Sequence, residues 1–156
     1  MEVMATAIIL LHPLCALAVI WLFINQRKWR QKSAILRGLE RQKELENHEK
    51  NGNKLFFYVI GVISLAFISK IFYFQIINGE VGISDLIPNH FHGWAGLLGL
   101  GLMIYLRHLG LRASKNRIEK RSFTKISNLH GRISDIMTYL IMIHAFLGFL
   151  YLLTYL

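Results

Sequence analysis

The stretch that decides the fold runs from residue 55 to residue 77 and reads LFFYVIGVISLAFISKIFYFQII. It contains one charged side chain, Lys70. Because an α-helix rises 1.5 Å per residue, about 20 mostly apolar residues cross the hydrocarbon core of a bilayer. The stretch is long enough and apolar enough, so we expect it to form a membrane-spanning helix.

Three further stretches of the same kind occupy residues 5–24, 91–109 and 129–153. The chain has 156 residues, of which 54% are hydrophobic, and this leaves room for one bundle and no separate soluble domain. We therefore predict an all-α integral membrane protein, a single domain (1–156) of four helices that run up-down-up-down. The first stretch has no basic residues before it and no small-residue cleavage site after it, so we expect a retained helix rather than a signal peptide.

Positive charge is concentrated between these stretches. Seventeen of the eighteen Lys and Arg residues fall in the blocks 27–54 and 107–132. Lys and Arg beside membrane spans mark the cytoplasmic side or its organellar equivalent. We predict that the loops 25–54 and 110–128 face the cytoplasm or stroma, and that both termini and the 78–90 loop face the outer or lumenal side. This distribution explains the net charge of +9 without nucleic acid as a partner.

The polar stretch 25–54 carries Ile35, Leu36 and Leu39 at helical spacing and ends in Asn51-Gly52-Asn53, which predicts a helix break. We interpret the stretch as an extension of the first helix whose basic side chains rest on anionic headgroups. An arm that docks on a partner is the alternative. His48 lies in this polar part and is expected to be solvated.

Five of the seven histidines lie in or at the ends of the apolar stretches: His12, His92, His108, His130 and His144. Histidine within a span is costly, and each one is therefore a functional-site hypothesis. In an up-down bundle the histidines at 12, 92 and 144 approach the outer side, and those at 108 and 130 approach the inner side. Two cofactors with axial ligands, one in each leaflet, would need such a distribution.

Helical geometry supports part of this arrangement. His130 and His144 are 14 residues apart, which gives a rise of about 21 Å and an angular offset of about 40° on one helix. Stacked b-type haems need this spacing on one face. His92 and His108 are offset by about 160° around the helix axis, so they do not share a face. His90 and His108 do lie on one face, so His90 is an alternative to His92 as a ligand.

Glycines accompany two of the candidate ligands. Gly96 and Gly99 follow His92 on its face of the helix, and Gly148 follows His144 by four residues. A flat porphyrin beside a helix needs a strip without Cβ atoms, so the glycines favour His92 as a ligand. The same pattern is also typical of a small-residue face where helices pack together.

Imidazole binds iron, zinc and copper alike. Zinc prefers three or four converging ligands, and the one cysteine, Cys15, excludes a cysteine cluster. Two imidazoles per site in an apolar bundle favour one or two haems b over zinc. Chlorophyll, which takes one axial imidazole, is the alternative.

Charged residues have expected roles near such cofactors. Lys70 either snorkels to the outer interface or neutralises a carboxylate such as a haem propionate. Arg107, Arg112 and Arg132 are candidates for pairing with inner propionates. We expect Asp135 to form an ion pair with Arg132, three residues earlier on the same helix.

The chain also resembles a known group of proteins through three motifs: His12-Pro13 in the first stretch, FHGWAGLLG at residues 91–99, and His130 at the start of the fourth. These motifs are similar to those of small haem-b membrane bundles such as the cytochrome b561 family. The resemblance is closer to an uncharacterised four-helix family of cyanobacteria and plastids.

The resemblance implies two haems with ligands on opposite helices. It places His12 with His92 at the outer haem, and His130 with a histidine on the second helix at the inner one. The stretch 55–77 has no histidine, and Phe57-Tyr58 occupies that neighbourhood. The inner site is therefore either lost or rebuilt with His108 opposite His130, and His144 is an additional outer candidate.

The function that we expect is electron transfer within or across a thylakoid or plasma membrane by a haem-b cytochrome, alone or with a redox partner. The alternative is an accessory pigment-binding or assembly subunit of a larger photosynthetic complex. A histidine-lined transporter is less favoured, because the spans offer few other polar groups. The chain lacks a Gly-x-Ser-x-Gly elbow and a phosphate-binding glycine loop, so nothing indicates hydrolase or transferase chemistry.

Overall fold

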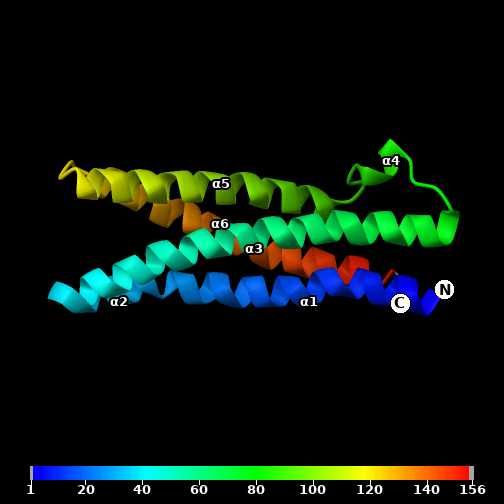
Figure 1. Ribbon diagram of the computed structural model, residues 1–156, viewed down its shortest axis with the longest axis horizontal. Helices are drawn as coiled ribbons and strands as arrows, with labels where there is room; N and C mark the ends of the chain where they lie inside the picture. Colours follow the sequence, from blue (N-terminus) through cyan, green and yellow to red (C-terminus); the bar gives the residue numbers. More distant parts are fainter. Residues whose placement is uncertain (1, 155–156) are drawn as a thin grey trace.

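A computed structural model describes residues 2–154 of the chain, and within them the side chains of residues 7–76 and 79–154. Every regular element in this part of the chain is a helix, so the predicted all-α class is confirmed. The elements are α1 (Glu2–Arg27), α2 (Trp29–Ile35), α3 (Gly38–Asn78), α4 (Ile83–Leu86), α5 (Phe91–Ile118) and α6 (Thr124–Leu152) (Figure 1).

Four helical segments are long and apolar enough to cross a membrane: Ala7–Ile35, Gly38–Ile76, Phe91–Ile118 and Thr124–Leu152. Large apolar side chains cover their outward faces. Trp21, Leu98 and Ile143, for example, are 64%, 59% and 55% exposed. Such a surface suits lipid rather than water, and it suggests a multi-pass membrane protein.

The four long helices lie side by side as two hairpins (Figure 1). Helix α1 packs mainly against α3, and α5 packs mainly against α6, whereas α3–α5 contacts are fewer and α1–α6 contacts are sparse. Phe23, Leu55, Met103, Leu106 and Met137 form the buried core shared by the hairpins. The two hairpins are thus joined less closely than the helices within each hairpin.

The two ends of the bundle differ in character. At one end, which we call the basic end, lie α2, the first turns of α3 and the turn between α5 and α6 (Figure 1). At the other, which we call the α4 end, lie both termini and the segment 79–90 with α4. The basic blocks of the sequence fall at the basic end.

The helices extend through the predicted loops, and the predicted break at Asn51-Gly52-Asn53 is wrong, since α3 continues across it. A Cβ atom at Gly52 would lie 3.0 Å from Nε2 of Gln26, so the glycine leaves room for this side chain of α1 on the surface of α3. The chain reverses instead at the start of α3, where its first residue, Gly38, has a φ of +54°, a left-handed conformation that favours glycine. Helix α3 is therefore 41 residues long, or about 61 Å, twice the hydrocarbon thickness.

Ion pairs join the two hairpins at the basic end. Asp135 on α6 accepts from Arg27 of α1 at 2.5 Å and from Arg30 of α2 at 2.7 Å, and Arg27 also donates to Thr138. The predicted pairing of Asp135 with Arg132 is wrong, since Arg132 forms no ion pair within the described residues. Across the other seam, Nη2 of Arg117 on α5 donates to both carboxylate oxygens of Glu49 on α3, at 3.0 and 3.1 Å.

Candidate cofactor site formed by two histidine groups

Three helices bring a histidine together towards the α4 end. His12 comes from α1, His92 from the first turn of α5 and His144 from α6, and each offers a ring nitrogen within 4.8 Å of those of the other two. All three rings are half-buried. The structure thus places together the three residues that the sequence indicates for the outer side.

Each of these rings is anchored through Nδ1 to a backbone carbonyl on a neighbouring helix. His12 contacts the oxygen of Val62 on α3 at 3.1 Å, while His92 and His144 contact one another's carbonyl oxygens at 3.0 and 3.1 Å. A carbonyl oxygen only accepts hydrogen bonds, so Nδ1 carries the proton and the lone pair is on Nε2. Metal-binding histidines are usually oriented in this way, with the second nitrogen free to coordinate.

The glycines near these histidines receive imidazole rings. A Cβ atom at Gly148 would lie 2.7 Å from Cε1 of His92, and one at Gly96 would lie 3.1 Å from Cε1 of His144. Gly99 faces Leu140, whose Cδ2 would be 3.8 Å from an added Cβ. The glycines at 96 and 148 are therefore needed for the α5 and α6 backbones to approach each other with a histidine ring between them.

The ring separations distinguish two kinds of pair in this group. A metal–imidazole nitrogen bond is about 2.0–2.1 Å long and the ring centre lies about 1.1 Å beyond that nitrogen, so two imidazoles on opposite sides of one ion have centres about 6.3 Å apart. The rings of His12 and His92 are 6.1 Å apart and inclined at 73°. Those of His92 and His144 are stacked at 4.0 Å, too close for an ion between them.

A second pair lies towards the basic end. The rings of His48 on α3 and His130 on α6 are 6.4 Å apart and inclined at 82°, which repeats the geometry of His12 and His92. Nδ1 of His130 lies 3.1 Å from the carbonyl oxygen of Leu106 on α5, so Nε2 of this ring is also free. The two pairs are thus alike in separation and inclination.

The expectation that His48 is solvated is wrong. Its ring stacks on Trp29 at 5.6 Å, and its Nδ1 is buried without a hydrogen-bond partner in the described part of the chain. Its backbone oxygen accepts from Nε2 of Gln26 at 2.6 Å, which holds this turn of α3 against α1. Sequence reasoning missed His48 because Asn51-Gly52-Asn53 was interpreted as a helix break, which separates His48 from the apolar stretch that begins at residue 55.

The structure does not bring His108 to His130. The side chain of His108 is exposed and makes no ring contact or hydrogen bond with any described residue. A Cβ atom at Gly110 would lie 3.6 Å from Cε1 of His130, so the ring of His130 packs near this turn of α5. It is His48, rather than His108, that lies opposite His130.

Two further candidates lie at the α4 end, outside the histidine group. Nζ of Lys70 is 3.4 Å from the carbonyl oxygen of Ile87 and 5.7 Å from the centre of the Phe74 ring. His90 caps α5, since its Nδ1 accepts from the N–H of Gly93 at 3.1 Å. Burial lowers the pKa of His90, which keeps this nitrogen available as an acceptor. His90 thus has a capping role that does not require a cofactor.

The arginines considered for inner propionates differ in their surroundings. Nε of Arg107 donates to Asn53 at 3.2 Å, and its guanidinium lies 4.8 Å from the centre of the Phe56 ring. Arg112 and Arg132 are exposed. Arg107 therefore helps to join α5 to α3.

Comparison with models of known protein families, with curated proteins and with solved structures finds no match for this chain. The assignment of a function therefore rests on the histidine geometry.

Proposed function

We propose that the protein is a membrane cytochrome that binds two b-type haems and carries electrons between the two sides of the membrane. His12 and His92 would hold the haem near the α4 end, and His48 and His130 would hold the one near the basic end. The observation that supports this most directly is the repeated geometry of the two pairs, 6.1 Å at 73° and 6.4 Å at 82°. Both separations match the value of about 6.3 Å for imidazoles on opposite sides of one metal ion.

The distribution of the four ligands over the fold supports the same function. Each long helix supplies one: His12 from α1, His48 from α3, His92 from α5 and His130 from α6. Each pair therefore connects one hairpin with the other along a diagonal of the bundle, α1 with α5 and α3 with α6, and these helices do not pack directly against each other within the described residues. The donor set is imidazole alone, which suits haem iron. Bound haem would supply the one-electron chemistry, while the chain supplies axial ligation, position and an apolar surrounding.

The depths of the two pairs suit transfer across a bilayer. His144, which stacks on His92, is 14 residues from His130 along α6, so the two pairs are about 21 Å apart along the bundle. His48 precedes Leu55, where the apolar stretch of α3 begins, by seven residues, or about 10 Å, so the pair near the α4 end would lie within the hydrocarbon core and His48 near the inner headgroups. In this arrangement the bundle runs up-down-up-down through the membrane. The positive-inside rule places the basic end in the cytoplasm or stroma and both termini on the outer or lumenal side of a plasma or thylakoid membrane.

Haem stoichiometry tests the proposal. A pyridine haemochrome assay with protein determination should give two haems per chain, falling to one in His48→Ala and to one in His92→Ala. His108→Ala is the matched control and should retain both. The proposal would be contradicted if the unmodified protein bound a single haem that His48→Ala did not remove, or if it bound no haem. A red chlorophyll band would instead favour the pigment-binding alternative.

The near-perpendicular rings provide a second readout. Perpendicular imidazole planes leave the two dπ orbitals of a low-spin ferric ion nearly degenerate, so both haems should give strongly anisotropic EPR signals with one large g-value. Rhombic signals of the kind that parallel ligand planes produce would contradict the pairings His12–His92 and His48–His130.

A second candidate function is supported by the convergence of three imidazoles. His12, His92 and His144 all present Nε2, and their ring nitrogens lie within 4.8 Å of one another, so the group is also suited to direct binding of one transition-metal ion. His144→Ala separates the two candidates. It should leave two haems per chain if the protein is a cytochrome, and it should abolish zinc or copper binding if the group holds a bare ion.

A further inference from the structure

The turn between α2 and α3 extends far beyond the apolar part of the bundle. We call residues 32–44, which include this turn, the arm tip. Gly38 precedes Leu55, where the apolar stretch of α3 begins, by 17 residues, or about 25 Å along the helix. The headgroup region adds only about 5–7 Å to each side of the hydrocarbon core. The arm tip therefore lies beyond the headgroups when α3 spans the membrane, and at a Debye length of about 8 Å it is largely screened from their charge.

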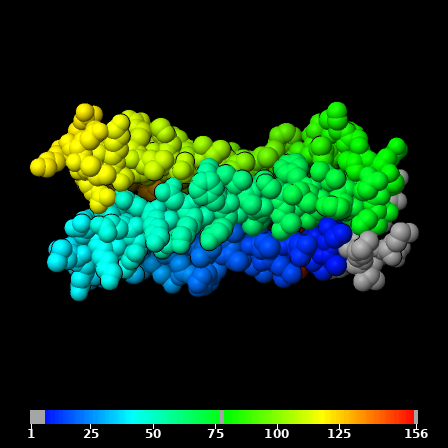
Figure 2. Space-filling view, viewed as in Figure 1, coloured from blue at the N-terminus to red at the C-terminus, as the bar shows by residue number. Residues whose placement is uncertain are grey.

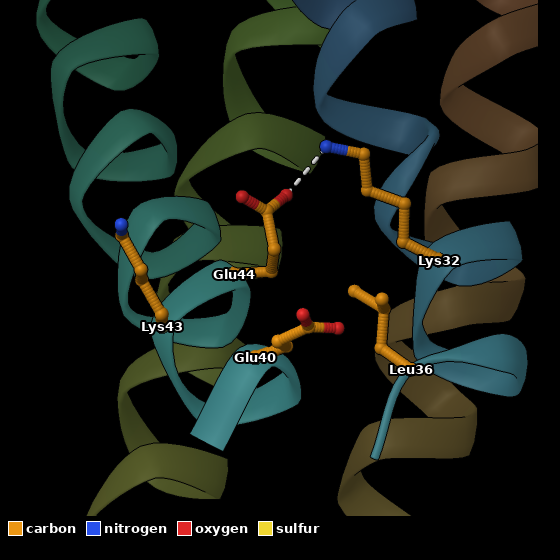
Figure 3. Close-up of a pocket in the computed structure, with 5 residues that line it drawn as sticks. All are labelled: Lys32, Leu36, Glu40, Lys43 and Glu44. Carbon is orange, nitrogen blue, oxygen red and sulfur yellow. Dashed lines mark hydrogen bonds and ion pairs between the residues drawn. The ribbon is translucent and has the colours of Figure 1, made fainter. Parts of the chain in front are cut away.

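The arm tip exposes apolar side chains in this aqueous position. Ile35 is 78% exposed and Leu39 is 85% exposed, and they lie four residues apart on either side of the turn. Leu36 lines a shallow pocket beside them (Figure 3). The other lining residues are Lys32, Glu40, Lys43 and Glu44. Lipid cannot cover apolar groups at this height, and such groups with a charged rim are typical of protein–protein interfaces.

Unpaired positive charge surrounds the arm tip. The two basic blocks hold seventeen cations and five acids. Three of the acids already pair with cations, and Figure 3 shows one such pair, in which Lys32 donates to Glu44 at 2.5 Å. Arg37 and Lys43 form no ion pair with any described residue. The surface around the apolar groups is therefore complementary to an acidic partner.

Aromatic rings connect the arm tip with the pair near the basic end. The guanidinium of Arg41 lies 5.8 Å from the centre of the Trp29 ring, which stacks on His48 at 5.6 Å, and the ring of His130 follows at 6.4 Å. His48 is ten residues from Gly38 along α3, or about 15 Å. In Figure 2 the arm tip (cyan) and the end of α5 (yellow) stand together at this end of the molecule. A protein seated on the arm tip would thus face the nearer histidine pair.

We propose that the arm tip is a docking surface for a soluble acidic protein that exchanges electrons with the His48–His130 site. The electron exchange rests on the proposed function, whereas the docking surface rests on the exposed apolar groups, the unpaired cations and the height above the headgroups. Trp29 lies between this surface and the histidine pair.

Binding is tested with the full-length protein in nanodiscs of neutral lipid. The probes are a fluorescent plant-type ferredoxin and an acidic flavodoxin, and basic cytochrome c serves as the negative control. Anisotropy should show that the acidic proteins bind and that binding weakens as salt is raised. The double variant Arg37→Glu/Lys43→Glu should weaken binding about tenfold or more, and Ile35→Ser/Leu39→Ser should weaken it about fivefold.

The matched control is Lys120→Glu/Lys125→Glu, which changes the net charge equally at the turn between α5 and α6. This control should weaken binding of the acidic proteins less than threefold, because charges away from the binding surface act only at long range and are screened by salt. Equal effects of the two charge reversals, or no binding of either acidic protein, would overturn the proposal. The proposal would also be overturned if the arm-tip variants altered attachment to phosphatidylglycerol vesicles but left binding of the acidic proteins unchanged, because the surface would then bind the membrane. The anisotropy readout does not require haem, so a protein that binds the probes but contains no haem would refute the proposed function and leave the docking surface standing.

Discussion

The histidine group near the α4 end and the pair near the basic end share one geometry but differ in what holds it. Near the α4 end, His92 and His144 anchor each other through reciprocal backbone hydrogen bonds and pack over glycines of the opposite helix. Near the basic end, His48 and His130 lie beside Trp29 and close to ion pairs that join the hairpins. The same arrangement of two histidine rings can thus be built from close helix packing or beside charged side chains, and the two ends should respond to different mutations.

Removal of one ligand should have the largest effect. His12→Ala should eliminate the haem near the α4 end, because an axial bond is lost and His90 cannot replace it. The His90 ring lies 5.9 Å from that of His92, but its Nδ1 accepts from the N–H of Gly93, so its Nε2 carries the proton and has no lone pair to offer. The haem held by His48 and His130 should remain, so that the haem content falls by half. Redox titration should then show one midpoint potential in place of two. Loss of both haems on this substitution would show that the two sites do not form independently.

Addition of a methyl group at the glycines should have a graded effect that is confined to the α4 end. Gly148→Ala should displace His92, because the new Cβ would lie 2.7 Å from its ring, and should destabilise the protein by about 1–3 kcal/mol with loss of haem from that site. Gly96→Ala, at 3.1 Å from His144, should have a smaller effect.

Gly101→Ala is the control for this series, since a Cβ atom there has no neighbour within 4 Å. Thermal unfolding and haem retention in detergent provide the measurement. The packing role of the glycines would be contradicted if all three alanine variants behaved alike.

Removal of the ion pair between the hairpins should have a smaller effect at the basic end. Asp135→Asn removes the acceptor for Arg27 and Arg30 and should cost about 1 kcal/mol, because the side chains of Arg27 and Asp135 are 29% and 40% exposed and water screens the pair. On heating, the haem held by His48 and His130 should be released at a lower temperature than in the unmodified protein. The exposed pair of Arg121 with Glu119 offers a control, and Arg121→Ala should leave release unchanged. If the haem near the α4 end were released first instead, the ion pair would not be what stabilises the site near the basic end.

The smallest expected effect comes from the aromatic neighbour of His48. Trp29→Leu removes the ring stacked at 5.6 Å and should shift one of the two midpoint potentials without loss of haem. Trp94→Leu, at an exposed residue of α5, is the matched control and should shift neither. A shift of both potentials in Trp29→Leu would indicate a general loosening of the bundle rather than a local effect.

Part of the site could be predicted from the sequence because it depends on positions along a single helix. The spacing of His130 and His144 on one face, and the glycines that follow His92 and His144, are properties of a regular helix that no neighbour alters. The pairing of His130 could not be predicted, because it depends on whether α3 continues through Asn51-Gly52-Asn53. Gly52 is unfavourable in an isolated helix, but here it allows the contact with Gln26, and tertiary packing outweighs the local propensity.

The sequence by itself determined that this chain forms four long apolar helices, that its positive charge gathers at one end, and that its histidines lie at two depths. Those properties follow from composition and from the helical period, which are local. Only the tertiary structure decided that His48 rather than His108 faces His130, that His144 stacks on His92 instead of lying opposite it, and that Asp135 pairs with Arg27 and Arg30. These contacts join residues from different helices, and the rotation of each helix about its own axis is set by how the helices pack against one another.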